Sequence, residues 1–419
     1  MLRILLTLGA FTVLTGDLLA TDIGVRQQLT SAKDNVHLDE WEHTWSPDEK
    51  TKVRIAKSTM QGGKQEGVDI IEVDNGKLSF TVIPTRGMSV LGVTQGDIRL
   101  GWESPVQEVV HPKFIRLEDR GGLGWLEGFN EWMVRCGLEY AGHPGNDPIA
   151  TDGGTPKPQQ LTLHGKIGNI PASEVEVIVD EEPPHRIRVR GQVVERGFYG
   201  PQLELWTEIS TVPGSSELRI DDIVINRGAD EQEFQVIYHA NYGRPLLEKG
   251  SQVIVAAKRV TPFDNHAASD IDNYATYVGP TKGFQEQVYL IEPFADERGK
   301  TIALLKNAAG DKGTAIRWST EQLPYLTIWK NTAATQTGYV TGIEPGTGYP
   351  FNRRIERHFG RVPRLKPGQE RRFSLEFTIL ADADAVSKTE QQVRDIQGDQ
   401  ETEVVSTPPD LKVVKEATR

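Results

Sequence analysis

The chain has 419 residues, of which 37% are apolar and 25% are charged, with 41 glycines and 24 prolines. This composition is typical of a globular protein rich in turns, long enough for one large β domain or two smaller ones. The formal charge of −12, from 47 basic and 59 acidic residues, argues against a polyanion-binding surface, so nucleic acid is not an expected partner.

The first residues are typical of a secretory signal peptide. Arg3 supplies a positive charge ahead of the apolar run 4–14, which is too short for a membrane span of roughly 20 residues but suits a signal. We expect residues 1–20 to be removed after Ala20, although Leu18 is larger than the small residue usual at that position. The protein is therefore expected to be exported, periplasmic or secreted, with no membrane span after cleavage. The alternative is a buried first strand.

Cys136 is the only cysteine, so an intrachain disulfide is excluded. Its apolar neighbours within 132–138 favour a small buried hydrophobic side chain over a nucleophile. We therefore expect no chemistry from this thiol.

Residues 21–60 are polar, with Trp41 and Trp45 as the large apolar anchors, and we expect an extension that lies over the edge of the domain. From Asp69 onwards, short runs rich in valine, isoleucine, phenylalanine and threonine alternate apolar with polar residues, which is the period of a half-buried strand. The predicted strands include 78–83, 174–179, 186–194, 202–210, 217–226, 234–239, 252–257, 314–318, 325–330 and 371–380.

Glycine, proline and asparagine separate these strands at short intervals, and no run of ten residues has a helical apolar period before the end of the chain. Strands that follow one another without helices form antiparallel sheets packed face to face. We therefore predict an all-β fold, a large antiparallel β-sandwich over residues 61–385 with few short helices. Residues 385–396 are predicted to form a short helix, and the charged tail 386–419 is expected to be mobile or lightly docked.

Four segments far apart in the sequence each end a β-prone run with a titratable residue close to glycine, proline or asparagine. They are Leu163-His164-Gly165, Tyr238-His239-Ala240-Asn241-Tyr242-Gly243-Arg244-Pro245, Thr261-Pro262-Phe263-Asp264 and the segment 342–352, which contains Glu344. Strands that end in this way place the side chain at the rim of a sheet, where a ligand can reach it.

The order of these motifs resembles the galactose mutarotase (aldose 1-epimerase) superfamily, as does the Leu365-Lys366-Pro367-Gly368 turn before the last strand. The segments Pro84-Thr85-Arg86-Gly87-Met88, Cys136-Gly137-Leu138 and 238–247 are similar to one branch of it, the DUF4432 family. The resemblance spans residues 65–385. It implies a galactose mutarotase-like supersandwich and a small-molecule carbohydrate as substrate.

The resemblance also implies roles for individual residues. His239 resembles the general acid that protonates the ring oxygen of the sugar, and Glu344 resembles the base that takes the proton from the anomeric hydroxyl. His164 and Asp264 resemble residues that hydrogen-bond the sugar. Catalysis is then expected from His239 and Glu344, without a metal or other cofactor.

Further candidates surround the motifs. The arginine that binds a sugar hydroxyl in mutarotases has no clear counterpart, and Arg86 is a better candidate than Arg135. Among aromatic residues that could stack on a sugar, Tyr242 and Trp329 adjoin motif positions. The full expected set of substrate-binding residues is His164, Asp264, Arg86, Asn241, Tyr242, Arg244 and Trp329.

Ring opening of a cyclic hemiacetal removes one proton and delivers another, so it needs an acid and a base with pKa values near neutrality. The ordinary pKa of imidazole is already near neutrality, and partial burial raises the pKa of a carboxyl group towards the same range. Each residue also has a plainer interpretation: a structural histidine, a solvated turn acid for Glu344, and an Asx turn or helix cap for Asp264. The joint order of the motifs favours the functional interpretation.

Basic residues near the motifs suggest an acidic or modified sugar, because arginine forks suit carboxylate, sulfate or phosphate groups. The alternative is that they are solvated charges at the rim. The set consists of Lys166, Arg244, Lys330, Arg353 and Arg354.

Two other functions stay open. The same site could abstract a carbon-bound proton as a sugar isomerase or lyase, with His164, His239 and Glu344 holding a divalent metal, although their spacing matches no standard ligand signature. The protein could also be a non-catalytic sugar-binding protein. Either a monomer or a homodimer is compatible with the sequence.

Overall fold

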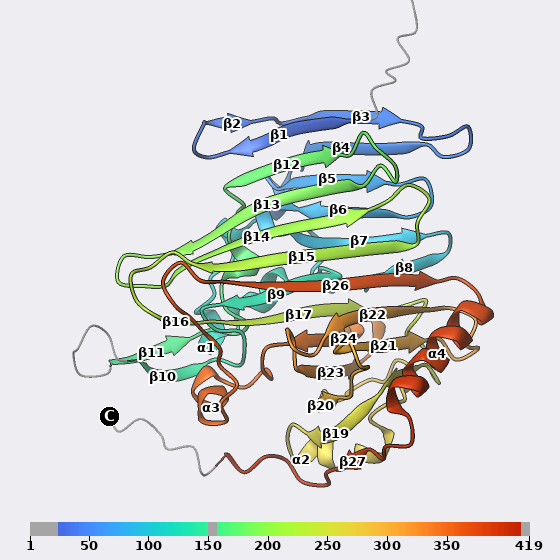
Figure 1. Ribbon diagram of the computed structural model, residues 1–419. Helices are drawn as coiled ribbons and strands as arrows, with labels where there is room; N and C mark the ends of the chain where they lie inside the picture. The colour runs from blue at the N-terminus through green and yellow to red at the C-terminus, as the bar shows by residue number, and fades with distance from the viewer. Residues whose placement is uncertain (1–23, 150–156, 412–419) are drawn as a thin grey trace, which may run out of the picture.

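A computed structural model describes residues 24–149 and 157–411 (Figure 1). The expected signal peptide, residues 1–20, lies outside the described residues. Among the described helices, none combines the length and the apolar character needed to cross a membrane.

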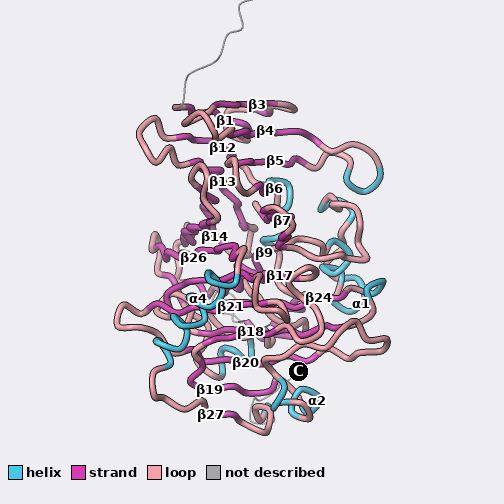
Figure 2. The backbone as a smooth tube through the Cα atoms, turned by 90° about the vertical axis from the view of Figure 1, so that its right-hand side faces the viewer, coloured by secondary structure: helices cyan, strands magenta, loops and turns pink. Residues whose placement is uncertain are grey.

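Two large sheets stack face to face, and Figures 1 and 2 show their strands running across the molecule in two layers. The predicted all-β class, a large antiparallel β-sandwich with few short helices, is confirmed. The smaller of the two sheets has ten strands, in the order β18 (Gln252–Val255), β21 (Lys300–Lys306), β22 (Gly313–Ser319), β26 (Glu370–Leu380), β15 (Glu217–Asn226), β14 (Gln202–Thr211), β13 (Ile187–Arg196), β12 (Glu174–Val179), β1 (Val25–Ser31) and β2 (Val36–His37).

The larger sheet has 13 strands and carries the motifs around His239 and Glu344. Its order is β27 (Glu403–Val404), β19 (Ala257–Pro262), β20 (Gln287–Pro293), β23 (Tyr325–Thr332), β24 (Tyr339–Gly346), β17 (Gln235–Tyr242), β9 (Met133–Leu138), β7 (Ser89–Gln95), β6 (Ser79–Ile83), β5 (Asp69–Asp74), β4 (Val53–Thr59) and β3 (Trp41–Trp45), with β8 (Ile98–Leu100) paired to β7.

The remaining elements are short. Two further pairs are β10 (Gly145–Ile149) with β11 (Lys157–Leu161), and β16 (Gln232–Glu233) with β25 (Arg364–Leu365). The α-helices are α1 (Asp119–Gly122), α2 (Asn265–Ala268), α3 (Arg353–His358) and α4 (Ala383–Gln397). Single 3-10 turns are η1 (Gly63–Gln65), η2 (Pro84–Arg86), η3 (Pro112–Phe114), η4 (Gly124–Gly128), η5 (Ile167–Asn169), η6 (Ile271–Asn273) and η7 (Thr335–Thr337).

The main core lies between the two sheets. In β13, buried and half-buried residues alternate along most of the strand, as the period of two requires when one face meets the core. Strands β17 and β24 are buried at every position, so both of their faces are covered. Tyr238, Ala240, Tyr242 and Ile343 belong to the core between the sheets, and the alternate residues therefore point to the opposite face of the larger sheet.

An irregular segment covers that opposite face. Figure 2 shows short helical turns, α1 among them, on the side of β6, β7 and β9 that faces away from β13, β14 and β26. This segment includes η3, α1 and η4. Trp125 and Phe129, from and just after η4, form a small apolar cluster with Val134 of β9 and Val340 of β24. The segment thus builds a second, smaller core on the outer face of the larger sheet.

Of the expected N-terminal extension 21–60, residues 24–60 are described, and they contribute strands to the sandwich rather than lying over its edge. Strand β1 pairs with β12 in the ten-stranded sheet, whereas β3 pairs with β4 in the larger sheet. Sequence patterns identify such edge strands poorly because their partners are distant in the chain. This segment therefore extends both sheets at the same end of the sandwich.

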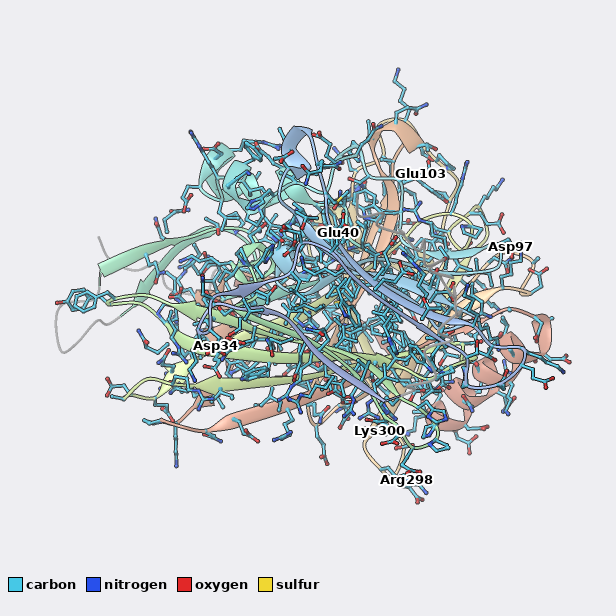
Figure 3. All side chains as sticks on the ribbon, turned by 90° about the horizontal axis from the view of Figure 1, so that it is seen from above. Asp34, Glu40, Asp97, Glu103, Arg298 and Lys300 are labelled. Carbon is cyan, nitrogen blue, oxygen red and sulfur yellow. The ribbon has the colours of Figure 1, made fainter. Side chains whose placement is uncertain are left out.

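The tail 386–419 is also docked over much of its described length. Helix α4 buries Val386 and Val393 against Ile302 and Leu304 of the ten-stranded sheet, in agreement with the helix predicted at 385–396. Beyond it, β27 pairs in parallel with β19. In Figure 3, Asp97 lies at the right-hand side of the molecule and Arg298 at its lower edge.

Candidate active site

His239 and Glu344 face one another across two neighbouring strands. Ala240 of β17 pairs with Ile343 of β24 in an antiparallel register, so His239 and Glu344 are cross-strand neighbours on the other face of the sheet. Nε2 of His239 lies 3.2 Å from Oε1 of Glu344, and their side chains are only 5% and 2% exposed. The fold therefore brings an imidazole and a carboxyl group together in a site that is nearly closed to solvent.

Three aromatic rings surround the His239 ring. The centroids of Phe129, Trp329 and Trp125 lie 5.4, 5.6 and 6.1 Å from it. Trp329 lies on β23 and was expected at the site, whereas Trp125 and Phe129 come from the irregular segment and were not chosen. The walls of the site are thus apolar and flat, as suits the face of a pyranose ring.

His164 completes the polar part of the site. Its ring centroid lies 5.3 Å from that of His239 and 4.7 Å from that of Trp125. Its Nδ1 lies 3.0 Å from the backbone oxygen of Ala141, and because a carbonyl oxygen only accepts, Nδ1 carries the hydrogen. Burial lowers the pKa of His164 to about 4, so at neutral pH its Nε2 is an unprotonated acceptor.

The backbone at His164 adopts a left-handed conformation, with φ of 59°. Such a conformation costs of order 1 kcal/mol in a residue with a side chain and persists only where the surroundings impose it. Here the backbone N–H of His164 donates to Gly142 and its carbonyl accepts from Gly137. The turn holds the ring in a fixed position next to His239.

Burial disfavours charge on both His239 and Glu344. It raises the pKa of Glu344 well above its ordinary value, with a further contribution from the Glu286 carboxylate. Burial also lowers the pKa of His239 well below its ordinary value, and nearby His164 adds to this, while the Asn241 side chain opposes it. Burial therefore favours the uncharged form of both groups.

Asn241 lies two residues from His239 on the same strand and the same face. Its Nδ2 donates to the backbone oxygens of Glu131 and His239, at 3.1 and 3.2 Å. These bonds fix the side chain beside the imidazole. Asn241 is thus placed at the site, but its amide group is directed mainly at the protein backbone.

Arg86, expected to bind a sugar hydroxyl, is fully buried among protein partners. Its Nη2 lies 2.7 Å from Oε1 of Glu131, and its Nη1 donates to the backbone oxygens of Val110 and Gly128, both at 3.0 Å. Gly128 directly precedes Phe129. Arg86 therefore anchors the segment that carries an aromatic wall of the site, and its guanidinium is directed at the protein.

Arg135, the other arginine considered, points into the core between the sheets. Its Nη2 donates to Oδ1 of Asp222 at 2.9 Å, and Tyr238 donates to the same carboxylate at 2.8 Å. This ion pair joins β9 of one sheet to β15 of the other. Arg135 therefore lies on the wrong face of the larger sheet to meet a ligand bound at His239.

Three other expected residues do not meet the pair. Tyr242 points to the core between the sheets, where its ring lies 6.4 Å from that of Trp132. Arg244 is exposed beyond the end of β17. Asp264 is exposed and caps α2, because its Oδ1 accepts from the backbone N–H of Ala267 at 2.8 Å. The helix cap considered from the sequence thus describes Asp264.

Two cations of the basic set, Lys330 and Arg353, are engaged by the protein. Lys330 donates to the backbone oxygens of Asn273 and Thr276, both at 2.8 Å, and Arg353 donates to Asp147 at 2.7 Å. Within residues 24–149 and 157–411, no group of three or more His, Cys, Asp or Glu residues is arranged to hold a metal ion. Cys136 is buried and unpaired, and burial raises the pKa of its thiol.

Comparison with known proteins identifies the family of this chain. The DUF4432 profile, which describes a domain of unknown function, matches residues 65–379. A crystal structure from Klebsiella pneumoniae, described as a candidate aldose 1-epimerase, superposes with a TM-score of 0.87 at 43% identity, covering 92% of this chain and 99% of that one. A search of the curated proteins finds no match.

More distant structures share the fold alone. A galactose mutarotase-like protein from Clostridium acetobutylicum has a TM-score of 0.52 at 14% identity, over 79% of this chain and 99% of that one. A candidate aldose 1-epimerase from Escherichia coli has a TM-score of 0.50 at 12% identity, over 75% and 99%. The sandwich is therefore a galactose mutarotase-like fold. Within this class the chain belongs to the DUF4432 family, as its motifs indicated.

Proposed function

We propose that this protein is a carbohydrate 1-epimerase that interconverts the anomers of a sugar by acid–base catalysis. The observation that carries the proposal is the 3.2 Å approach of Nε2 of His239 to Oε1 of Glu344 within an aromatic enclosure. The substrate must have an anomeric hydroxyl and a ring oxygen, because the reaction removes a proton from the first and delivers one to the second.

The reaction needs one donor and one acceptor at a time. In ring opening, the base takes the proton of the anomeric hydroxyl while the bond between the anomeric carbon and the ring oxygen breaks, and the acid protonates that oxygen. The resulting aldehyde rotates about its first carbon–carbon bond, and reclosure reverses both proton transfers to give the other anomer. The pair of His239 and Glu344 keeps a single proton throughout, so it finishes each cycle ready for the next.

Either position of the shared proton provides the required donor and acceptor. With the proton on His239, the imidazolium protonates the ring oxygen and the Glu344 carboxylate is the base, as the family resemblance implies. With the proton on Glu344, which burial favours, the roles exchange. Because anomerisation is reversible, the enzyme passes through both arrangements, and each group contributes about 10²–10⁴-fold to the rate.

The surrounding residues support binding of a sugar ring. Phe129 and Trp329 offer flat apolar surfaces beside the pair, and such surfaces stack on the apolar face of a pyranose. His164 presents an unprotonated Nε2 that accepts a hydrogen bond from a sugar hydroxyl. Exclusion of water by these rings strengthens the hydrogen bonds made inside the site.

The sequence also suggested an acidic or modified sugar. That hypothesis rested on the basic set, and two of its members, Lys330 and Arg353, are engaged by protein oxygens. A neutral sugar is therefore the first substrate to test.

The test is the rate of anomeric exchange measured by NMR for a panel of neutral, acidic and sulfated sugars. We expect wild-type protein to accelerate exchange and His239→Asn and Glu344→Gln each to lose about 10²–10⁴-fold. Matched controls are His266→Asn and Glu292→Gln, which change the same residue types at exposed or half-exposed positions. No acceleration by folded wild-type protein on any sugar would overturn the proposal.

Two further arms separate the alternative functions. Loss of activity on addition of a chelator would favour the metal-assisted isomerase or lyase. Sugar binding that both variants weaken, without catalysis by the wild type, would favour a binding protein.

We also propose export of the protein, on the strength of Arg3 and the apolar run 4–14. Expression of the full chain followed by cell fractionation and N-terminal sequencing tests this. The expected mature protein begins at Thr21, and an intact N-terminus in the cytoplasmic fraction would contradict export.

A further inference from the structure

A carboxylate that no sequence motif indicated lies beside the proposed catalytic site. Glu286 immediately precedes β20 and is exposed. Val288 of β20 pairs with Trp329 of β23, so Glu286, two residues before Val288, points to the same face of the sheet as Trp329. That face also carries His239 and Glu344. Glu286 therefore stands at the solvent side of the aromatic enclosure.

Glu286 is joined directly to one wall of the site. Its Oε2 accepts a hydrogen bond of 2.7 Å from Nε1 of Trp329, and the Trp329 ring lies 5.6 Å from the ring of His239. A bond to a charged acceptor is stronger than one between neutral groups. It holds the indole edge-on at the entrance and leaves Oε1 of Glu286 available to a ligand that stacks on Trp329.

The charge of Glu286 is not neutralised by a partner. In the described part of the chain, no lysine, arginine or histidine lies within ion-pair distance of Glu286, although 28 ion pairs occur among the other described residues. The negative field of such an exposed carboxylate is weakened only by solvent and salt, and not by a protein cation. Any anionic group on an incoming sugar would meet that field before it reached His239.

The field reaches the interior of the site. After burial, the Glu286 carboxylate is the second cause that raises the pKa of Glu344. The pKa of His143 is lowered because the surrounding protein removes water from its ring. The Glu286 carboxylate opposes this shift. The Glu286 carboxylate is therefore near enough to the site to oppose a negative charge on Glu344.

We propose that Glu286 is a specificity-determining residue that admits sugars with hydroxyl or ammonium groups near Trp329 and disfavours sugars that carry a carboxylate, sulfate or phosphate there. Its free oxygen accepts a hydrogen bond from the sugar, and its charge repels an anion. This inference rests on the proposed epimerase activity, and it is opposite in sign to the acidic sugar suggested by the sequence.

The test compares kcat/KM for a neutral hexose and for the matching hexuronic acid at low ionic strength. Glu286→Gln keeps an oxygen that accepts from Trp329 and removes the charge. We expect it to raise the ratio of acidic to neutral kcat/KM by about tenfold, from the loss of like-charge repulsion at short range. Glu286→Ala, which also loses the bond to Trp329, should raise the same ratio.

Glu292→Gln is the matched control, because it removes the same charge from β20, the strand that Glu286 immediately precedes. Six residues separate it from Glu286, about 20 Å along a strand, which is beyond the screening length at physiological salt. We expect it to leave the ratio as in the wild type. Added salt should raise the wild-type ratio towards that of Glu286→Gln and leave the variant nearly unaffected.

The outcomes separate this inference from the function on which it rests. If the wild type accelerates exchange of neutral sugars but Glu286→Gln leaves the acidic-to-neutral ratio within twofold, the specificity role is wrong and the epimerase proposal stands. A wild type that already prefers the acidic sugar would also overturn the role of Glu286. If the wild type accelerates no sugar, both proposals fall together.

Discussion

Gly342 lies beside Glu344 on β24, and the absence of a side chain at Gly342 makes room for the carboxyl group of Glu344. A Cβ atom built on Gly342 would overlap Oε1 of Glu344 and would lie 3.2 Å from Cε1 of His239. Gly342 pairs with Asn241 on one side and with Trp329 on the other. The glycine is thus required at the centre of the site.

The substitution Gly342→Ala should therefore displace Glu344 or His239. We expect kcat to fall about 10²-fold, the cost of a misplacement near 1 Å, with stability lower by about 1–3 kcal/mol from overpacking. Anomeric exchange and thermal unfolding measure the two effects. In the control Gly279→Ala, the new Cβ would make only an ordinary contact of 3.5 Å. Full activity in Gly342→Ala would contradict the assigned geometry.

The direct contact between His239 and Glu344 predicts that they act as a unit. Residues that share one proton lose their joint function when either is replaced, so their effects on rate do not add. We expect the double variant His239→Asn, Glu344→Gln to be no more than about threefold slower than the worse single variant. Steady-state exchange rates by NMR measure this. Losses that multiply would show that the two groups act in separate steps.

Arg86 predicts a loss of stability rather than of sugar binding. Its guanidinium and Glu131 form a buried ion pair at 2.7 Å, with both side chains fully buried. In Arg86→Lys the shorter ammonium group cannot keep every bond, and removal of a buried partner costs about 3–5 kcal/mol. Chemical denaturation should show a loss of about 3 kcal/mol. An unchanged stability with a tenfold higher KM would instead restore the role of Arg86 as a sugar ligand.

Glu195 predicts a pH-dependent stability. It is 3% exposed, its Oε2 accepts from the backbone N–H of Leu138 at 2.7 Å, and burial raises its pKa from 4.5 to about 7, with Glu139 adding to the shift and Lys166 opposing it. The folded state thus holds the proton more tightly than the unfolded state. The stability that this proton gives is full below pH 4.5 and is lost as the pH rises to about 7.

Replacement by glutamine removes this titration while keeping an acceptor for Leu138. Relative to the wild type, Glu195→Gln should gain about 3 kcal/mol of unfolding free energy between pH 5 and pH 8, since one pKa unit corresponds to about 1.4 kcal/mol. Denaturant titrations at both pH values measure the gain. The exposed Glu217→Gln is the control. A constant difference between variant and wild type at the two pH values would show that Glu195 titrates normally.

The fold and the centre of the site were accessible from the sequence because they depend on local patterns. Alternating residues identified the strands, and titratable residues close to glycine, proline or asparagine at strand ends led to His239, Glu344 and His164, which the structure places together. The same alternation also separates His239 and Asn241 from Tyr242, which points to the other face. Application of that rule to the motif would have excluded Tyr242 from the sequence alone.

The rest of the site depends on contacts between distant segments. Phe129 lies beside His239 in an irregular segment that Arg86 and Ser104 hold through hydrogen bonds to Gly128 and Phe129, and no periodicity in that segment indicates its position. Glu286 reaches Trp329 through the pairing of β20 with β23. Asp264 is a candidate from the sequence that does not lie at the site. Its carboxylate caps helix α2 by accepting a hydrogen bond from the backbone N–H of Ala267.

The strands that end the two sheets have a consequence for how the protein behaves in a crowded solution. A long exposed edge strand invites pairing with another chain and so promotes aggregation. Here β2 and β27 have two residues each and β18 has four, so at three of the four sheet ends the outermost strand is too short to pair at length with another chain. Strand β2 near the N-terminus and strand β27 near the C-terminus therefore leave only short outermost strands on this sandwich of more than twenty strands. Short outermost strands disfavour pairing between the sheet edges of two molecules.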